Sequence, residues 1–158
     1  MSVLGELQPN KVFKYFEEIC SIPHGSRNLQ QISDYLVDFA KAHELKYRQD
    51  EDLNVIIWKD GSKGYEASEP VILQGHMDMV AVKEADCDKD MEKEGLDLEI
   101  NGDYISAKGT SLGGDDGIAV AYTLAVLDDE EMAHPPIEAI FTVNEEIGML
   151  GAATIDVS

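Results

Sequence analysis

The sequence predicts an α/β fold, a layered domain in which a mixed central sheet is flanked by helices. Two observations lead to this prediction. Stretches with helical apolar stripes alternate with short apolar runs that are typical of buried strands. An Asn-Gly pair between two alternating runs adds an antiparallel hairpin, which would make the sheet mixed. With 158 residues and 44% apolar content, the chain is long enough for one compact domain over residues 1–158.

Three helices are expected. The first covers residues 8–22, where apolar side chains recur at steps of three and four, with Pro9 near its start and Pro23 after its end. The second covers residues 28–44, which carry a single apolar stripe. The third covers residues 118–127, which follow a glycine-rich turn and are small and apolar, as suits a well-buried helix.

Five extended segments are expected. Residues 45–48 and 54–59 are short runs, and the second is rich in the β-branched and aromatic residues that strands favour. Residues 70–75 and 136–143 are nearly continuous apolar runs, the pattern of interior strands in a sheet that is covered on both faces. Residues 98–106 hold the Asn-Gly pair and predict a hairpin.

The composition excludes several classes of partner. Lys and Arg number 12 against 32 Asp and Glu, which gives a formal charge of −20. This charge disfavours phosphate backbones and anionic lipids, so we expect no nucleic-acid partner and no membrane partner. There is no basic and apolar leader and no window long enough to span a bilayer, so we expect a cytoplasmic protein. Cys20 and Cys87 form no disulfide framework and no CxxC motif, and are expected to be reduced thiols.

Three pairs of polar residues lie at the ends of the apolar strands or in the adjoining turns, where α/β folds gather their ligand-binding residues. They are His76 with Asp78, Asp115 with Asp116, and Glu145 with Glu146. Imidazole and carboxylate groups without paired cysteines suit zinc, manganese or cobalt.

Each pair alone has a structural explanation, as a surface turn, a helix cap or an exposed loop. Their combination favours a metal site, because acids directly after strands this apolar carry a desolvation cost unless they are paired or bound to a cation. Serine-hydrolase and nucleotide-binding functions are excluded, since the sequence contains neither a GxSxG elbow nor a Walker motif.

The order and spacing of these pairs resemble a known family. The sequence reads QGHMDMV at residues 74–80, AKGTSLGGDDGIA at residues 107–119 and TVNEEIGMLGA at residues 142–152. These segments resemble the bacterial aminoacyl-histidine dipeptidases, also called Xaa-His dipeptidases or peptidase D. They belong to a wider di-zinc family with the aminoacylases, tripeptidases and glutamate carboxypeptidases. At residues 113–117 this chain has Gly-Gly-Asp-Asp-Gly where that branch often has Gly-Ala-Asp-Asn-Gly, which leaves the ligand type intact.

The resemblance implies a role for each residue. His76 would bind one Zn²⁺, Asp115 would bridge two, and Glu146 would bind the other, with Co²⁺ or Mn²⁺ as alternative metals. Asp78 would orient the imidazole of His76, as metal-bound histidines generally require. Glu145 would be the general base that activates water for hydrolysis of Xaa-His dipeptides. The peptide bond after Asp115 would be cis.

The resemblance also implies that the chain is the N-terminal portion of a metallopeptidase catalytic domain. Two further ligands, an acid and a histidine, would lie beyond Ser158. The lid or dimerisation domain would be absent from the chain, and the full-length protein would be a homodimer. Three hypotheses remain: a di-zinc dipeptidase of which this chain carries part of the site, a non-catalytic metal-binding or partner-binding fragment, and a related di-zinc tripeptidase or aminoacylase.

Overall fold

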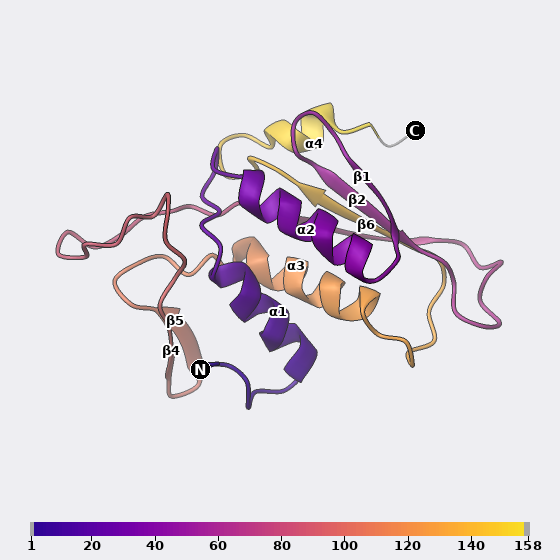
Figure 1. Ribbon diagram of the computed structural model, residues 1–158, viewed down its shortest axis with the longest axis horizontal. Coiled ribbons are helices and arrows are strands. Elements are labelled where there is room, and N and C mark those ends of the chain that lie inside the picture. Colours follow the sequence, from indigo (N-terminus) through magenta and orange to yellow (C-terminus); the bar gives the residue numbers. More distant parts are fainter. Residues whose placement is uncertain (1, 157–158) are drawn as a thin grey trace.

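The computed structural model of the protein describes residues 2–156 and confirms the predicted fold class (Figure 1). The elements along the chain are α1 (Asn10–Cys20), α2 (Gln30–Ala42), β1 (Lys46–Gln49), β2 (Val55–Lys59), β3 (Val71–His76), β4 (Leu98–Asn101), β5 (Tyr104–Ala107), α3 (Gly114–Leu127), β6 (Ile137–Thr142) and α4 (Leu150–Thr154). Each predicted helix and strand is present, and most ends differ from the prediction by one or two residues. The short helix α4 was not predicted.

The central sheet has four strands in the order β1-β2-β6-β3. Strand β2 pairs antiparallel with β1 and with β6, whereas β3 pairs parallel with β6. The sheet is therefore mixed, as predicted, but for a different reason. The predicted hairpin forms a separate two-stranded sheet of β4 and β5, so the mixture comes from β6, which has one antiparallel and one parallel neighbour.

Of the two strands predicted to be interior, only β6 is. It lies between β2 and β3, and four of its six residues are fully buried in succession. Strand β3 lies at the edge of the sheet within residues 2–156, and its first two residues, Val71 and Ile72, are 44% and 59% exposed. The prediction for β3 was wrong because an apolar run indicates that a strand is suited to burial but does not provide the neighbour that buries it.

Helices α1, α2 and α3 pack together beside the sheet (Figure 1). Helix α1 contacts α3, which contacts β3, and α2 contacts β1 and β2. Between them lies a core of fully buried side chains, including Ile19, Leu36, Val55, Leu124 and Phe141. Because side chains alternate along a strand, the residues of β6 on either side of Phe141 point to the other face of the sheet. The polar side chains at the ends of β3 and β6, which are described below, lie on that second face.

The assigned helix α3 begins at Gly114, but Asp115 and Asp116 have non-helical backbone angles. Regular helix therefore starts at Gly117, close to the predicted start. The preceding Gly113 has a φ of 69°, a conformation that glycine adopts without strain.

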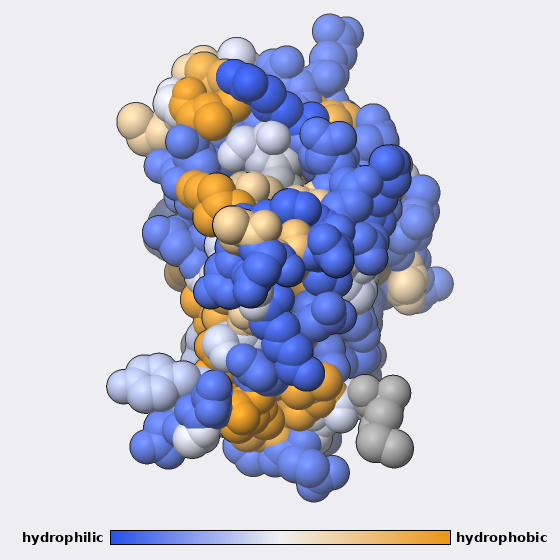
Figure 2. All heavy atoms as spheres, turned by 90° about the vertical axis from the view of Figure 1, so that its left-hand side faces the viewer, coloured by the Kyte–Doolittle hydropathy of each residue, from blue (hydrophilic) through white to orange (hydrophobic). Residues whose placement is uncertain are grey.

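The surface on the side of the loop between β3 and β4 is mostly hydrophilic, interrupted by separate hydrophobic patches (Figure 2). Exposed apolar residues of that loop include Val80 and Val82, and the hairpin exposes Ile100. Both predicted thiols, Cys20 and Cys87, are free. None of the helices within residues 2–156 is long and apolar enough to cross a membrane.

Gly151 marks the closest approach of α4 to the sheet. A Cβ atom at this position would lie 2.4 Å from Asn54 Oδ1 and 2.6 Å from the backbone nitrogen and oxygen of Val143. Those Val143 atoms belong to the backbone that leaves β6 and cannot move independently. Only glycine therefore fits between α4 and this strand end.

We expect Gly151→Ala to lower the free energy of unfolding by about 1–3 kcal/mol, because the added methyl group overpacks a backbone contact. The matched control is Gly114→Ala, where the nearest atom to the new Cβ is a side-chain carbon of Leu112 at 3.9 Å. This control should change the free energy by less than about 0.5 kcal/mol. Urea denaturation of both variants measures the difference, and equal stability would contradict the packing described here.

Candidate metal centre

The three polar pairs predicted from the sequence lie together in the structure. His76 is the last residue of β3 and is aligned with Thr142, the last residue of β6. Glu145 and Glu146 lie in the segment after β6, separated from its end by two residues, and Asp115 lies in the turn that begins α3. Because β3 and β6 are parallel, their carboxyl ends meet at one edge of the sheet, which is the usual position of binding sites in α/β folds.

The His76 imidazole is the centre of this arrangement. Its Nε2 atom lies 3.1 Å from Asp115 Oδ1 and 3.8 Å from Glu145 Oε2. The ligand atoms of His76, Asp115 and Glu146 all lie within 4.8 Å of one another. The ring is buried, whereas the Asp115 side chain is 87% exposed and that of Glu145 is 39% exposed. The carboxylates therefore reach the imidazole from the solvent side.

This donor set fits a divalent cation. One imidazole nitrogen and two carboxylates from three separate segments converge on one point, and these are ligands that zinc and similar metals accept. Within residues 2–156, no other set of three or more His, Cys, Asp and Glu side chains gathers its ligand atoms so closely. His76, Asp115 and Glu146 are thus the residues of this part of the chain that can hold a metal.

A pocket of about 510 Å³ opens at the centre. Its polar wall contains His76, Asp115 and Glu145, and an apolar wall includes Ile140 of β6 and Met149 next to α4. The imidazole is therefore accessible from this pocket on one side only, through Nε2. A small molecule in the pocket would meet the carboxylates and the imidazole at the same end.

Charges around His76 favour its protonated form in the metal-free protein. Burial of the ring lowers the pKa of His76, but the hydrogen bond to Asp115 and the negative charge of Asp78 raise it by more, so that the pKa stands above its ordinary value. Burial raises the pKa of Asp116, although its contact with His76 opposes this shift. The nearby carboxylates of Asp115 and Glu145 add to this rise, and a cation at the centre would reduce that repulsion between the acids.

Asp78 lies beside His76, and its contacts differ from those that the resemblance implied. The closest acceptor to His76 Nδ1 is the backbone carbonyl oxygen of Asp78, at 3.0 Å, whereas the carboxylate Oδ1 is 3.5 Å away. The carboxylate instead accepts hydrogen bonds from the Ser26 hydroxyl and from the backbone N–H groups of Glu145 and Glu146. Nδ1 is therefore oriented mainly by the main chain, which leaves Nε2 directed toward the pocket.

Asp115 and Asp116 contact different parts of His76. The peptide bond between the two residues is cis, as the resemblance implied. Asp115 faces the imidazole of His76, and Asp116 Oδ2 accepts a hydrogen bond from the backbone N–H of His76 at 3.3 Å. A Cβ on Gly75 would lie 3.1 Å from the same carboxylate oxygen, so glycine at this position lets Asp116 approach the end of β3.

Three polar residues that hold the segments around this centre were not predicted from the sequence. They are Ser26, Asn54 and Asn144. Ser26 and Asn144 lie in turns, where such residues are common for local reasons. Asn54 is 1% exposed at the start of β2, and a buried polar residue at the start of an apolar strand was the one signal that could have singled it out.

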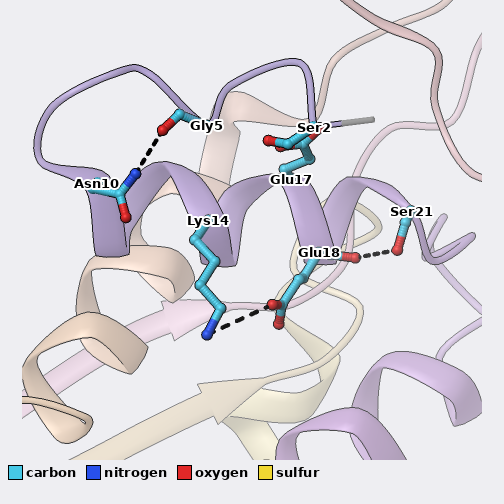
Figure 3. Close-up of a pocket in the computed structure, with 7 residues that line it drawn as sticks. All are labelled: Ser2, Gly5, Asn10, Lys14, Glu17, Glu18 and Ser21. Atoms are coloured by element: carbon cyan, nitrogen blue, oxygen red, sulfur yellow. Dashed lines mark hydrogen bonds and ion pairs between the residues drawn. The ribbon is translucent and has the colours of Figure 1, made fainter.

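A second hollow, of about 430 Å³, lies against α1 and shares no residue with the centre (Figure 3). Its polar side chains contact one another or nearby backbone: Asn10 donates to the Gly5 carbonyl, Lys14 lies 3.9 Å from Glu18, and the Ser2 hydroxyl donates to Glu17. Because these groups already have partners, the hollow provides no set of free ligand groups.

Comparison with known proteins confirms the predicted resemblance. The chain is 41% identical over 152 residues to the cytosol non-specific dipeptidase of Escherichia coli strain K12, which covers 96% of this chain and 31% of that protein. Its fold matches the crystal structure of aminoacylhistidine dipeptidase from Vibrio alginolyticus with a TM-score of 0.94 and 39% identity, over 97% of this chain and 31% of the other.

A tripeptidase from Staphylococcus aureus shares the fold at a TM-score of 0.76 and 24% identity, over 96% of this chain and 41% of the other. No protein-family model matches the sequence. The chain spans about a third of the length of the two dipeptidases that it matches. Over that third, sequence and fold both relate it to peptidases.

The electrostatic environment of His76 can be tested in the metal-free chain. We expect an NMR titration of the imidazole to give a pKa above the ordinary value of 6.5, and Asp115→Asn to lower it, since the hydrogen-bonded carboxylate loses its charge. Because the folded-state pKa is raised, protonated His76 stabilises the fold at low pH, and this contribution is lost as the pH rises through the raised pKa. A pKa at or below 6.5 in the unsubstituted chain would contradict this account.

Proposed function

We propose that this chain, a relative of the aminoacyl-histidine dipeptidases over nearly its whole length, carries part of the active site of a metal-dependent dipeptidase that acts on Xaa-His peptides. The observation that carries the proposal is the convergence of His76, Asp115 and Glu146, with ligand atoms within 4.8 Å of one another. Glu145 lies next to this group, 3.8 Å from His76. A water molecule in the pocket would therefore find both a cation and a base.

In this proposal His76 would hold one Zn²⁺, Glu146 would hold a second and Asp115 would be shared by both; Co²⁺ and Mn²⁺ are alternatives. When bound, such a metal pair lowers the pKa of a water molecule and polarises the carbonyl group of the scissile peptide bond. The imidazole is fixed for this purpose by the Asp78 carbonyl oxygen at Nδ1. Only its Nε2 atom is left to bind a metal.

Glu145 is proposed as the general base. Of the two acids that line the pocket, Asp115 and Glu145, it is the one that is not assigned to a metal. It accepts a proton from water as the water oxygen attacks the peptide carbonyl carbon. It then gives that proton to the amine as the carbon–nitrogen bond breaks, so that the base is regenerated at the end of each cycle.

Adjacent acids can take different roles because the chain turns at this point. The Glu145 and Glu146 backbone N–H groups both point to Asp78, while Asn144 has a left-handed φ of 53°. Both side chains lie near His76, but only Glu145 lines the pocket, whereas Glu146 belongs to the group of possible metal ligands.

About two thirds of the length of each dipeptidase relative lies outside the part that matches this chain. The proposal assigns to that length the two further metal ligands, the substrate contacts and a homodimer interface. It also places the enzyme in the cytoplasm, in line with the name of the Escherichia coli relative and the high acidic charge. If the further ligands are absent, the alternative of a non-catalytic metal-binding or partner-binding protein applies.

The role of Glu145 can be tested in a full-length protein that carries this chain. We expect Glu145→Gln to reduce kcat for an Xaa-His dipeptide by about 10²–10⁴-fold, because the amide cannot accept the proton. Zinc content, measured by atomic absorption, should stay unchanged, since Glu145 is not assigned as a ligand.

Glu99→Gln is the control for the charge change, because Glu99 lies on the β4–β5 hairpin and its carboxylate contacts Ser106. This variant should retain full activity. Retention of full activity by Glu145→Gln would contradict the assignment of the base, and loss of zinc from it would assign Glu145 to the metal instead.

A further inference from the structure

Asp78 is a buried carboxylate with an unusual set of partners. Its Oδ1 atom accepts the backbone N–H of Glu145 at 3.0 Å. Its Oδ2 atom accepts the Ser26 hydroxyl at 2.7 Å and the backbone N–H of Glu146 at 3.4 Å. The side chain is fully closed to solvent. Since water cannot replace these donors, the carboxylate and the Glu145–Glu146 backbone must keep a fixed relation to each other.

The turn at residues 24–27 is attached to the strand end on which Asp78 lies. The Met79 N–H donates to the His24 carbonyl, and the Ser26 N–H donates to the Met79 carbonyl, both at 3.1 Å. A Cβ on Gly25 would lie 2.7 Å from the Ala81 side chain, so the two segments are in close contact. The Ser26 hydroxyl is thus held at a defined position next to Asp78.

The same turn reaches the segment after β6 directly. The Arg27 N–H donates to Asn144 Oδ1 at 2.8 Å, and Arg27 itself has a left-handed φ of 72°. Asn144 immediately precedes Glu145. The turn at residues 24–27 therefore contacts the Glu145–Glu146 segment by two routes, one through Asp78 and one through Asn144.

Asn54 holds the two ends of the segment that contains Glu145 and Glu146. Asn54 Oδ1 accepts the Val143 N–H at 3.1 Å, and its Nδ2 donates to Asp50 at 2.8 Å and to the Gly151 carbonyl at 3.3 Å. Asn54 fixes the chain before Asn144 and after the two glutamates. Between these points, the Glu145 carbonyl accepts the N–H groups of Gly148 and Met149, and the N–H groups of the two glutamates donate to Asp78.

We infer that Ser26 is a positioning residue, which acts through Asp78 to set the place of the Glu145 and Glu146 carboxylates. This inference rests on the proposed function for what the two glutamates do, and on the hydrogen bonds alone for how they are held. Asp78 accordingly serves two parts of the centre at once: its carbonyl oxygen orients His76 and its carboxylate orients the glutamate segment.

Removal of the Ser26 hydroxyl should affect the two glutamates unequally. Oδ2 of Asp78 would keep only the 3.4 Å contact with the Glu146 N–H, in a place that water does not reach. The carboxylate would have to turn to recover a second donor, and this rotation would carry the weakly bonded Glu146 amide with it. Glu146 is the proposed metal ligand, so metal affinity should fall.

The test compares Ser26→Ala with Ser26→Thr, which keeps the hydroxyl, and with Ser33→Ala. Ser33 is a matched control because its buried hydroxyl donates to a backbone carbonyl, that of Leu53, at 2.7 Å and contacts no residue of the centre. The first measurement is hydrogen exchange of the Glu145 and Glu146 amides by NMR in the metal-free chain. The second is calorimetric titration with ZnCl₂ of a full-length protein that carries this chain.

We expect Ser26→Ala to lower the protection of the Glu146 amide by about tenfold or more and that of the Glu145 amide by less, and to weaken zinc binding by about 10–100-fold, as removal of groups that orient metal ligands usually does. Ser26→Thr should restore both, and Ser33→Ala should change neither. The inference is overturned if the exchange of the two amides in Ser26→Ala matches that in Ser33→Ala. Absence of zinc binding by the unsubstituted full-length protein would overturn the proposed function instead, while the exchange data still decide the role of Ser26.

Discussion

The parallel pairing of β3 with β6 is the contact on which the candidate centre depends. It aligns His76 with Thr142, so the chain leaves both strands at the same level and the segments that follow meet. A shift of this register by one residue would turn His76 to the face packed by the helices, since alternate residues of a strand point to opposite faces. The burial of Ala139 and Phe141 in the core fixes the register of β6, and through it the position of the imidazole.

Near the end of β3, carboxylate groups are held in two different ways. The Asp78 carboxylate is buried, and hydroxyl and backbone N–H donors satisfy it. The carboxylates of Asp115 and Glu145 are exposed and face one imidazole. The first carboxylate has its donors within the protein, whereas the second pair keeps oxygen atoms free toward the pocket. This difference is the physical basis for separating the residue that positions from the residues proposed to bind metal or water.

Much of the fold could be predicted from the sequence because its elements have strong local patterns. The stripes of α1 and α2, the Asn-Gly hairpin and the apolar run of β6 all appear where expected. Helix α4 was missed because it has five residues and includes Gly151, so it has too short a pattern to detect. The edge position of β3 and the separation of the hairpin from the main sheet depend on which strands pair, and no local pattern contains that information.

The candidate centre was predicted in type from the residues and in detail only from the resemblance. The strand-end positions of His76 and Glu145 indicated a metal site, and the family likeness supplied a role for each residue. The contact of Ser26 with Asp78 joins residues 52 positions apart, and that of Asn54 with Val143 joins residues 89 apart. Such contacts follow from the path of the backbone, and a serine in a turn carries no sign of them.

The most direct measurement of the central claim is a crystal structure of the chain soaked with zinc, with data collected at the zinc absorption edge. The account predicts anomalous density about 2.0–2.2 Å from His76 Nε2 and from carboxylate oxygens of Asp115 or Glu146. Zinc bound only at other acidic positions of the surface, with no density beside His76, would contradict it.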